Sequence, residues 1–264
     1  MTHAPDKRNL VRYDLGLSEM RSLEQELIAR AKAEVGGTAE LIAVWIRPFS
    51  RYANLMRSHE ASIFPEAKEV SIDDESRSLF FALIDLRSDP SIVIGATLCG
   101  AVPPDGGVQY EPQENTVTSS GFIFIDQLID LGNFSLSGFT SYLESIGIAP
   151  HRSMSVETIY RIGAKVAPWK GLSVTDVAFS CFFRSLQRGG GTLGRSAVLA
   201  TVNEAAISVF KRFGLRFEYL MGRSDFFTPE AELGRMSVPI VMVYDQYAED
   251  LFSSVTISIA ECTL

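Results

Sequence analysis

The sequence has few of the residues that bind metals or form disulfides. It contains three cysteines and three histidines among 264 residues. Cys99, Cys181 and Cys262 do not have the spacing of a metal site or a disulfide framework. The histidines form neither a metal pair nor a Ser/His/Asp pattern. These absences argue against a metalloenzyme and a triad hydrolase, and we expect no bound metal.

Positive charge and long apolar runs are also scarce. Lys and Arg total 24 against 32 Asp and Glu, which gives a net charge of −8. Because phosphate contacts need clustered Lys and Arg, we expect no nucleic-acid partner. The first ten residues do not have the apolar core of a signal peptide, and no uninterrupted apolar run reaches the length of a membrane helix. We therefore expect a cytoplasmic protein without a membrane span.

The remaining composition is that of a globular domain that buries a sizeable core, with 46% hydrophobic and 21% charged residues. In the N-terminal part, apolar residues at helical spacing predict a helix that begins at Ser18 as its N-cap and ends at Gly36–Gly37. The run 40–47, bounded by Pro48, fits either a strand or a short helix, and 49–64 has helical spacing. Residues 1–77 thus form an elaborated, mainly helical N-terminal part.

The middle of the chain is rich in branched and aromatic residues. Residues 78–86 and 91–102 predict an antiparallel hairpin across the turn "RSDP". The Pro- and Gly-containing stretch 103–115 has loop composition. For residues 121–147 we expect a short strand at 121–125, followed by helical turns.

From residue 151 onwards the order of predicted elements is β-α-β-α-β-β. A strand ends at Pro168, an apolar helix runs to the three glycines at 189–191, and a fully apolar strand, "SAVLATV", follows. The next helix has Asn203 as its N-cap. This order predicts an α/β (α+β) fold, with a mixed, mostly antiparallel central sheet flanked by helices. We predict one domain over residues 1–264.

The turn "VAPWKGLSVTDV", residues 166–177, connects a strand to a helix. Backbone N–H groups at such a helix start attract anions, so a turn of this kind can bind phosphate. Phosphate loops usually contain two or three glycines, but this turn has Gly171 alone. By itself, the turn fits either a phosphate loop or an ordinary strand-to-helix connection.

Together with the segment that follows it, this turn resembles the GNAT acyltransferase superfamily. The resemblance extends over about 155–220, and it makes 155–247 the best-matching donor-binding core. In the turn, the matching residues are Val166, Pro168, Lys170 and Gly171. In the following strand and helix, "VLATVNEAAISVFKRFGLRF", they are Asn203, Ala206, Lys211, Gly214 and Leu215.

The upstream half is similar to two branches of this fold, the acyl-homoserine-lactone synthases and the long-chain N-acyl amino acid synthases. In those proteins, Arg and Glu in an early helix precede an Asp-containing turn and a hairpin with a Val-Ile-Gly centre. The matching residues are Arg57, Glu60, Asp73, Asp74, Ile94 and Gly95. Leu98 stands where these branches often have an arginine.

The resemblance implies an N-acyltransferase that moves an acyl group from acyl-CoA or acyl carrier protein to the amine of a small molecule such as an amino acid. The amine attacks directly, and no cofactor is permanently bound. Glu157 is the candidate general base, and the backbone N–H near Val166 is the candidate oxyanion contact. Arg57 and Arg161 are candidates for binding the acceptor. The candidate donor-binding residues are Val166, Ala167, Lys170, Gly171, Leu172, Ser173, Val174, Asn203 and Phe210.

Two departures from the family pattern keep alternatives open. The turn has Leu172 and Ser173 where the family has further glycines, and Phe210 stands where a proton-donating tyrosine is often found. The alternatives are an acetyl-CoA-dependent acetyltransferase of a protein or small amine, and a non-catalytic member that binds a thioester or a partner.

Overall fold

The computed structural model divides the chain into two compact units. Unit 1 consists of residues 1–98, 157–185 and 254–264, and unit 2 of residues 99–156 and 186–253. The structure describes residues 10–65, 69–87, 89–100, 123–149, 153–162, 182, 197–212, 216–226, 228–230, 235–243 and 259–264.

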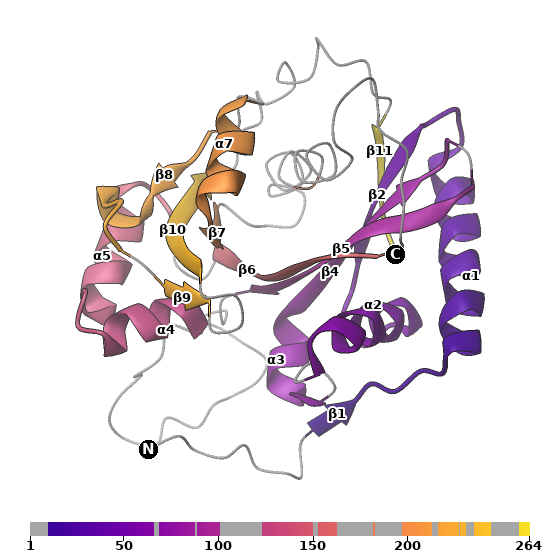
Figure 1. Ribbon diagram of the computed structural model, residues 1–264, viewed down its shortest axis with the longest axis horizontal. Coiled ribbons are helices and arrows are strands. Elements are labelled where there is room, and N and C mark those ends of the chain that lie inside the picture. The colour runs from indigo at the N-terminus through magenta and orange to yellow at the C-terminus, as the bar shows by residue number, and fades with distance from the viewer. Residues whose placement is uncertain are drawn as a thin grey trace. The chain divides into compact units, whose positions relative to one another are not determined.

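Unit 1 carries the N-terminal helices on strands from distant parts of the sequence (Figure 1). Strands β5 and β6 begin or end in unit 2, because the unit boundaries fall within them. The elements are β1 (Leu10–Arg12), α1 (Leu17–Val35), β2 (Leu41–Ile46), α2 (Arg51–Ile63), β3 (Glu69–Ser71), α3 (Ile72–Arg77), β4 (Ser78–Asp85), β5 (Ser91–Gly100), β6 (Ser153–Arg161) and β11 (Ile259–Thr263).

The strands of unit 1 follow the order β11-β2-β4-β5-β6, and β1 pairs separately with β3. Strand β2 pairs antiparallel with β4, with Trp45 opposite Phe81, and parallel with β11. Every residue of β2 is buried, which settles the run that fitted both a strand and a helix. The predicted hairpin strands become the neighbouring strands β4 and β5.

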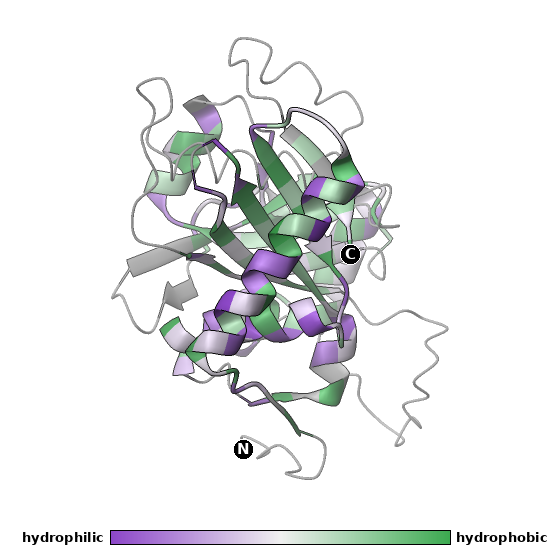
Figure 2. Ribbon diagram, turned by 90° about the vertical axis from the view of Figure 1, so that its right-hand side faces the viewer, coloured by the Kyte–Doolittle hydropathy of each residue, from purple (hydrophilic) through white to green (hydrophobic). Residues whose placement is uncertain are grey.

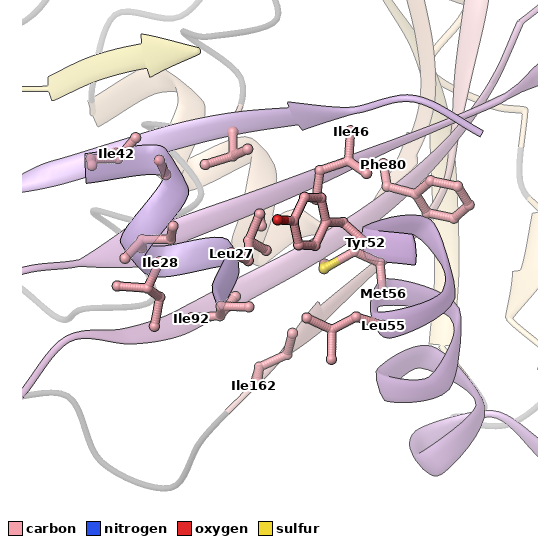
Figure 3. Close-up of a cluster of buried hydrophobic side chains, with 14 of the residues drawn as sticks. Leu27, Ile28, Ile42, Ile46, Tyr52, Leu55, Met56, Phe80, Ile92 and Ile162 are labelled. Atoms are coloured by element: carbon pink, nitrogen blue, oxygen red, sulfur yellow. The ribbon is translucent and has the colours of Figure 1, made fainter. Parts of the chain in front are cut away.

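Helices α1 and α2 cover one face of these strands. Leu27 and Ile28 of α1 meet Ile42 of β2, while Tyr52 and Met56 of α2 pack in the same cluster (Figure 3). Tyr160 and Ile162, from 100 residues later in the chain, complete the cluster. Long-range apolar burial therefore fixes β6 against α2, and this contact places the candidate catalytic strand.

Helix α1 begins two residues earlier than the sequence indicates. Its N-cap is Gly16, and not Ser18, and the carboxylate of Glu19 accepts a hydrogen bond from the Gly16 N–H (2.9 Å). Glu19 thus holds the backbone of the N-cap residue, and no N-cap side chain binds the N–H groups of the first turn as the expected serine would. The end at Gly36 is confirmed, with a left-handed φ of 52°. Helix α1 carries both hydrophilic and hydrophobic residues, and the strands behind it are mainly hydrophobic (Figure 2).

Unit 2 contains fewer of the described strands and has its own helices. Its strands follow the order β6-β7-β10-β8, and β9 also pairs with β10. Strands β6 and β7 are parallel, with Ser153, Met154 and Ser155 opposite Ala197, Val198 and Leu199. The elements are α4 (Ile123–Asp130), α5 (Leu136–Ser145), β7 (Ala197–Val202), α7 (Glu204–Arg212), β8 (Glu218–Tyr219), the 3-10 turn η4 (Leu220–Gly222), β9 (Thr228–Glu230) and β10 (Arg235–Val243).

The strand predicted at 121–125 is wrong for the residues that the structure describes. Ile123 begins α4, in which Ile125 and Leu128 are fully buried, three residues apart on one helical face. They pack with Phe139 and Leu143 of α5, which repeat a similar spacing. A short run of alternating aromatic and branched residues fits a strand locally, but packing against α5 stabilises a helix here.

These elements confirm the predicted fold class of helices around a large, mostly antiparallel sheet. The parallel pairs β11–β2 and β6–β7 make the sheet mixed. The stretches 103–115, 163–181 and 183–196 lie outside the described residues, with their predicted loop, turn and most of one helix. None of the described helices combines the length and the apolar character that a membrane crossing requires.

Candidate active-site strand and its buried polar cluster

Strand β6 carries the candidate base, Glu157. Because side chains alternate along a strand, Thr158 and Tyr160 share one face of β6, and Glu157 and Arg161 share the other. Thr158 and Tyr160 both contact α2. Glu157 is half-buried, Arg161 is exposed, and both have interactions with other groups. Glu157 lies two residues beyond Ser155, the last residue of β6 that is paired with β7.

On the α2 side of β6, Arg57 is the centre of a buried ion-pair network. Its side chain is 8% exposed. Nη1 donates to Glu60 (2.8 Å), Nε donates to Glu75 (3.1 Å), and Nη2 donates to the hydroxyl of Ser78 (2.8 Å). The guanidinium also lies 4.9 Å from the ring centroid of Phe80. Arg57 therefore links α2 to α3 and to β4.

Glu60 extends this network to two strands. Its Oε2 accepts from Arg57 and from the Thr97 hydroxyl on β5 (3.0 Å), while its Oε1 accepts from the Thr158 hydroxyl on β6. The carboxylate is 3% exposed. Three elements thus each donate one hydrogen bond to the Glu60 carboxylate, and a buried carboxylate needs such donors in place of water.

The carboxylates beside Arg57 keep its guanidinium charged. Burial alone lowers the pKa of Arg57, but the carboxylates of Glu60 and Glu75 outweigh it and raise that pKa above its ordinary value. Burial and the charge of Glu75 raise the pKa of Tyr13, which lies after β1. Tyr13 is therefore neutral near pH 7.

Tyr160 provides a second contact between β6 and α2. Its hydroxyl donates to the backbone carbonyl of Met56 (2.8 Å). Complete burial raises its pKa well above the ordinary value. The ring lies over Gly95 of β5, where a Cβ atom would be 2.4 Å from Cε2 of Tyr160 and 2.8 Å from Cε of Met56. The glycine of the Val-Ile-Gly centre is therefore required for this packing.

In unit 2, the residues predicted to contact the donor include Asn203 and Phe210. Asn203 is the N-cap of α7, because its Oδ1 accepts from the Ala206 N–H (3.0 Å). Phe210 is fully buried, and its ring centroid is 5.8 Å from that of Phe217. The capping prediction is confirmed, while the donor contacts of both residues stay predictions.

Several predicted residues lie outside the described part of the chain. These are Val166, Ala167, Lys170, Gly171, Leu172, Ser173 and Val174. Within the described residues, no group of three His, Cys, Asp or Glu is arranged to hold a metal ion. Cys99 and Cys262 are buried, and neither forms a disulfide within the part of the chain that the structure describes.

The structure also adds residues that the sequence did not single out. Glu75, Ser78, Thr97 and Thr158 are the hydrogen-bond partners of Arg57 and Glu60. A signal for one of them is present in the sequence, since Thr97 interrupts a run of apolar strand residues. Glu60, the partner of both threonines, is separated from Thr158 by 98 residues, and no local pattern indicates that pairing.

Comparisons with known proteins bear on the fold. No protein-family model matches the chain, and no curated protein matches it. The crystal structure of the AHL synthase LasI covers 82% of this chain and 96% of its own at 9% identity, with a TM-score of 0.50. BjaI, a CoA-dependent acyl-homoserine lactone synthase solved with SAM and isopentyl-CoA, covers 84% and 93% at 11% identity, with a TM-score of 0.47. FeeM, an N-acyl amino acid synthase from uncultured soil microbes, covers 89% and 92% at 10% identity, with a TM-score of 0.37. The alignment with LasI shows that this chain has the fold of an acyl-homoserine-lactone synthase, which confirms the GNAT-like fold expected from the sequence.

Proposed function

We propose that the protein is an N-acyltransferase that moves an acyl group from an acyl thioester to the amine of a small molecule, such as an amino acid. The observation that carries the proposal is the half-buried Glu157 on β6, in a chain with the fold of LasI. A fold accommodates many chemistries, so the argument for this activity depends on the residues of β6 and of the turn that follows it.

Glu157 is the proposed general base. A half-buried carboxylate can take a proton from the ammonium form of the acceptor, directly or through one water molecule. The neutral amine then attacks the thioester carbon, and the backbone N–H near Val166 stabilises the oxyanion. Collapse of the tetrahedral intermediate breaks the C–S bond and expels the thiolate, and the nitrogen gives its remaining excess proton to water or to the thiolate, which leaves the neutral amide. Phe210 carries no acidic proton, so the thiolate receives its proton from another group or from water.

The proposed donor is acyl-CoA or acyl carrier protein, and both present a pantetheine thioester. The amides of pantetheine can pair with the backbone of β6 beyond Ser155, as an added strand does. Lys170, Gly171 and Ser173 would meet a donor phosphate at the helix start. Arg161 shares a strand face with Glu157 and is exposed, which suits it to an acceptor carboxylate.

Arg57 was predicted to bind the acceptor, and the structure places it among buried partners. Three of its nitrogen atoms already donate to Glu60, Glu75 and Ser78. An acceptor carboxylate would compete with two protein carboxylates for this guanidinium. We therefore propose Arg161 before Arg57 as the residue that binds the acceptor.

A thiol-release assay tests the proposal. Acetyl-CoA, a long-chain acyl-CoA and a long-chain acyl carrier protein would each be combined with a panel of amino acids and simple amines. Thiol release that depends on an amino acid and a long-chain donor supports the proposal. Release with acetyl-CoA alone favours the acetyltransferase, and tight donor binding without release favours the non-catalytic binding protein.

The same assay tests the role of Glu157. Glu157→Gln is expected to lower turnover by about 100-fold while donor binding stays within about twofold of the wild type. Glu144→Gln, an exposed carboxylate on α5, is the matched control and should retain full turnover. Unchanged turnover in Glu157→Gln, or equal loss of turnover and donor binding, would remove Glu157 as the base.

A further inference from the structure

We propose that Glu60 is a positioning residue, which holds β6 through the hydroxyl of Thr158 and so sets the place of the neighbouring carboxylate of Glu157. The inference rests on the proposed acyl transfer. It assigns a function to a buried cluster that supplies none of the reacting groups.

The first observation is the geometry of Glu60. One oxygen of its carboxylate is bound by Arg57 and Thr97, and the other accepts from Thr158. Both oxygens are therefore occupied, and the side chain is 3% exposed. A carboxylate in this state has no access to a substrate proton, so Glu60 itself is not the base.

The second observation is that Glu60 is held independently of β6. Arg57 binds Glu60 from one helical turn earlier, and Arg57 is itself fixed by Glu75 of α3 and Ser78 of β4. If the Thr158 contact were removed, the Glu60 carboxylate would still have its two Oε2 donors. In the contact between Glu60 and Thr158, α2 is therefore the fixed element and β6 is the element that is positioned.

The third observation connects this contact to Glu157. Thr158 and Glu157 are adjacent and point to opposite faces of the same strand, so a rotation of the backbone at Thr158 also redirects Glu157. Tyr160 is bound to the Met56 carbonyl of α2 (2.8 Å), so β6 is tied to α2 at two alternate residues. A misplacement of a catalytic group by about 1 Å can lower the rate about 100-fold. A shift of Glu157 after loss of the Thr158 contact would therefore be enough to reduce turnover.

The test compares two threonines that donate to the same carboxylate. Thr158→Val and Thr97→Val each remove one hydroxyl and keep the β-branched shape, but only residue 158 is next to Glu157. We expect Thr158→Val to lower kcat by about 10-fold or more, with donor affinity unchanged and the acidic limb of the pH profile of kcat/KM, where the base is protonated, shifted. Thr97→Val should retain kcat within about twofold and have the wild-type pH profile.

Thr158→Ser restores the hydroxyl and is expected to recover most of the turnover. If Thr158→Val does not fold, as judged by circular dichroism and thermal unfolding, Glu60→Asp provides the second test. Its shorter side chain loses reach to Thr158, and we expect the same loss of kcat. Wild-type kcat in every folded variant of Thr158 and Glu60, or an equal loss in Thr97→Val and Thr158→Val, overturns the inference.

Failure of the proposed function gives a different result. If the proposed function is wrong, the wild type shows no thiol release from a long-chain donor. Failure of the positioning inference leaves the wild type active and Glu157→Gln impaired, while Thr158→Val behaves like the wild type.

Discussion

The ring of Tyr160 lies against the backbone of Gly95, and a Cβ atom at position 95 would be 2.4 Å from Cε2 of that ring. The clash involves a fully buried aromatic ring whose hydroxyl is bound to the Met56 carbonyl. The ring cannot move aside without losing that hydrogen bond. Gly95 is therefore required by the contact between the neighbouring strands β5 and β6. Its φ lies outside the left-handed region, so the backbone conformation alone does not require glycine.

Gly95→Ala is expected to destabilise the native state by about 3 kcal/mol, because overpacking of a closed core forces ring and backbone to shift. Urea unfolding of the purified variant measures the change. In a Tyr160→Ala background the same substitution should have a much smaller effect, since the obstructing ring is absent. Equal effects in the two backgrounds would contradict the clash.

Arg57→Ala is expected to lower the free energy of unfolding by about 3–5 kcal/mol. It leaves the carboxylates of Glu60 and Glu75 buried without their cation, and an uncompensated buried charge is strongly destabilising. Arg51→Ala on the same helix is the control. Arg51 pairs with Glu26 at 2.6 Å, but the two side chains are 59% and 41% exposed, so its loss should change stability by about 1 kcal/mol at most. Similar losses in the two variants would show that the buried network adds no stability of its own.

The sequence predicted the local parts of this fold better than the long-range parts. Helical spacing and a terminal glycine predicted most of α1 and its end at Gly36. The N-cap was placed two residues too late, because the spacing of apolar residues does not show the hydrogen bond between the Gly16 N–H and the Glu19 carboxylate. The strand expected at 121–125 was wrong for a different reason, since packing against α5 stabilises a helix from Ile123.

The candidate site shows the same limit. Arg57 was proposed because it matches a position of a family pattern, and Glu157 because it lies at the start of the predicted donor-binding strand. Asn203 was recognised as a cap from a local signature. The contact between Glu60 and Thr158 joins residues 98 positions apart, so it depends on how α2 and β6 pack and not on any local pattern. Periodicity indicates which face of an element is buried, but it does not indicate which polar residues of two buried faces meet.

His59 makes stability depend on pH. Burial lowers its pKa from 6.5 to about 4 in the native state, so native His59 is neutral at pH values where the unfolded chain binds a proton. Below about pH 6.5 the unfolded state therefore binds more protons, and stability falls with pH until about pH 4. Between about pH 7 and pH 5 this residue accounts for a loss of roughly 2 kcal/mol.

Urea unfolding of the wild type and His59→Gln at both pH values isolates this contribution. The variant should lose roughly 2 kcal/mol less than the wild type on going from pH 7 to pH 5, whatever its stability at pH 7. Carboxylates and the other histidines contribute equally to both proteins and cancel. An identical loss in the two proteins would show that His59 titrates normally in the native state.

Asn203 has a demonstrated function as a cap and a proposed one as a donor contact, and two substitutions separate them. Asn203→Ala removes the acceptor of the Ala206 N–H, so stability should fall by about 1 kcal/mol. Asn203→Asp retains an oxygen acceptor at the cap and should keep the stability of the wild type. Its negative charge repels an anionic donor, so the Kd for coenzyme A, measured by calorimetry, should rise by about fivefold to tenfold. Donor affinity equal to that of the wild type in the stable Asp variant would limit Asn203 to its capping function.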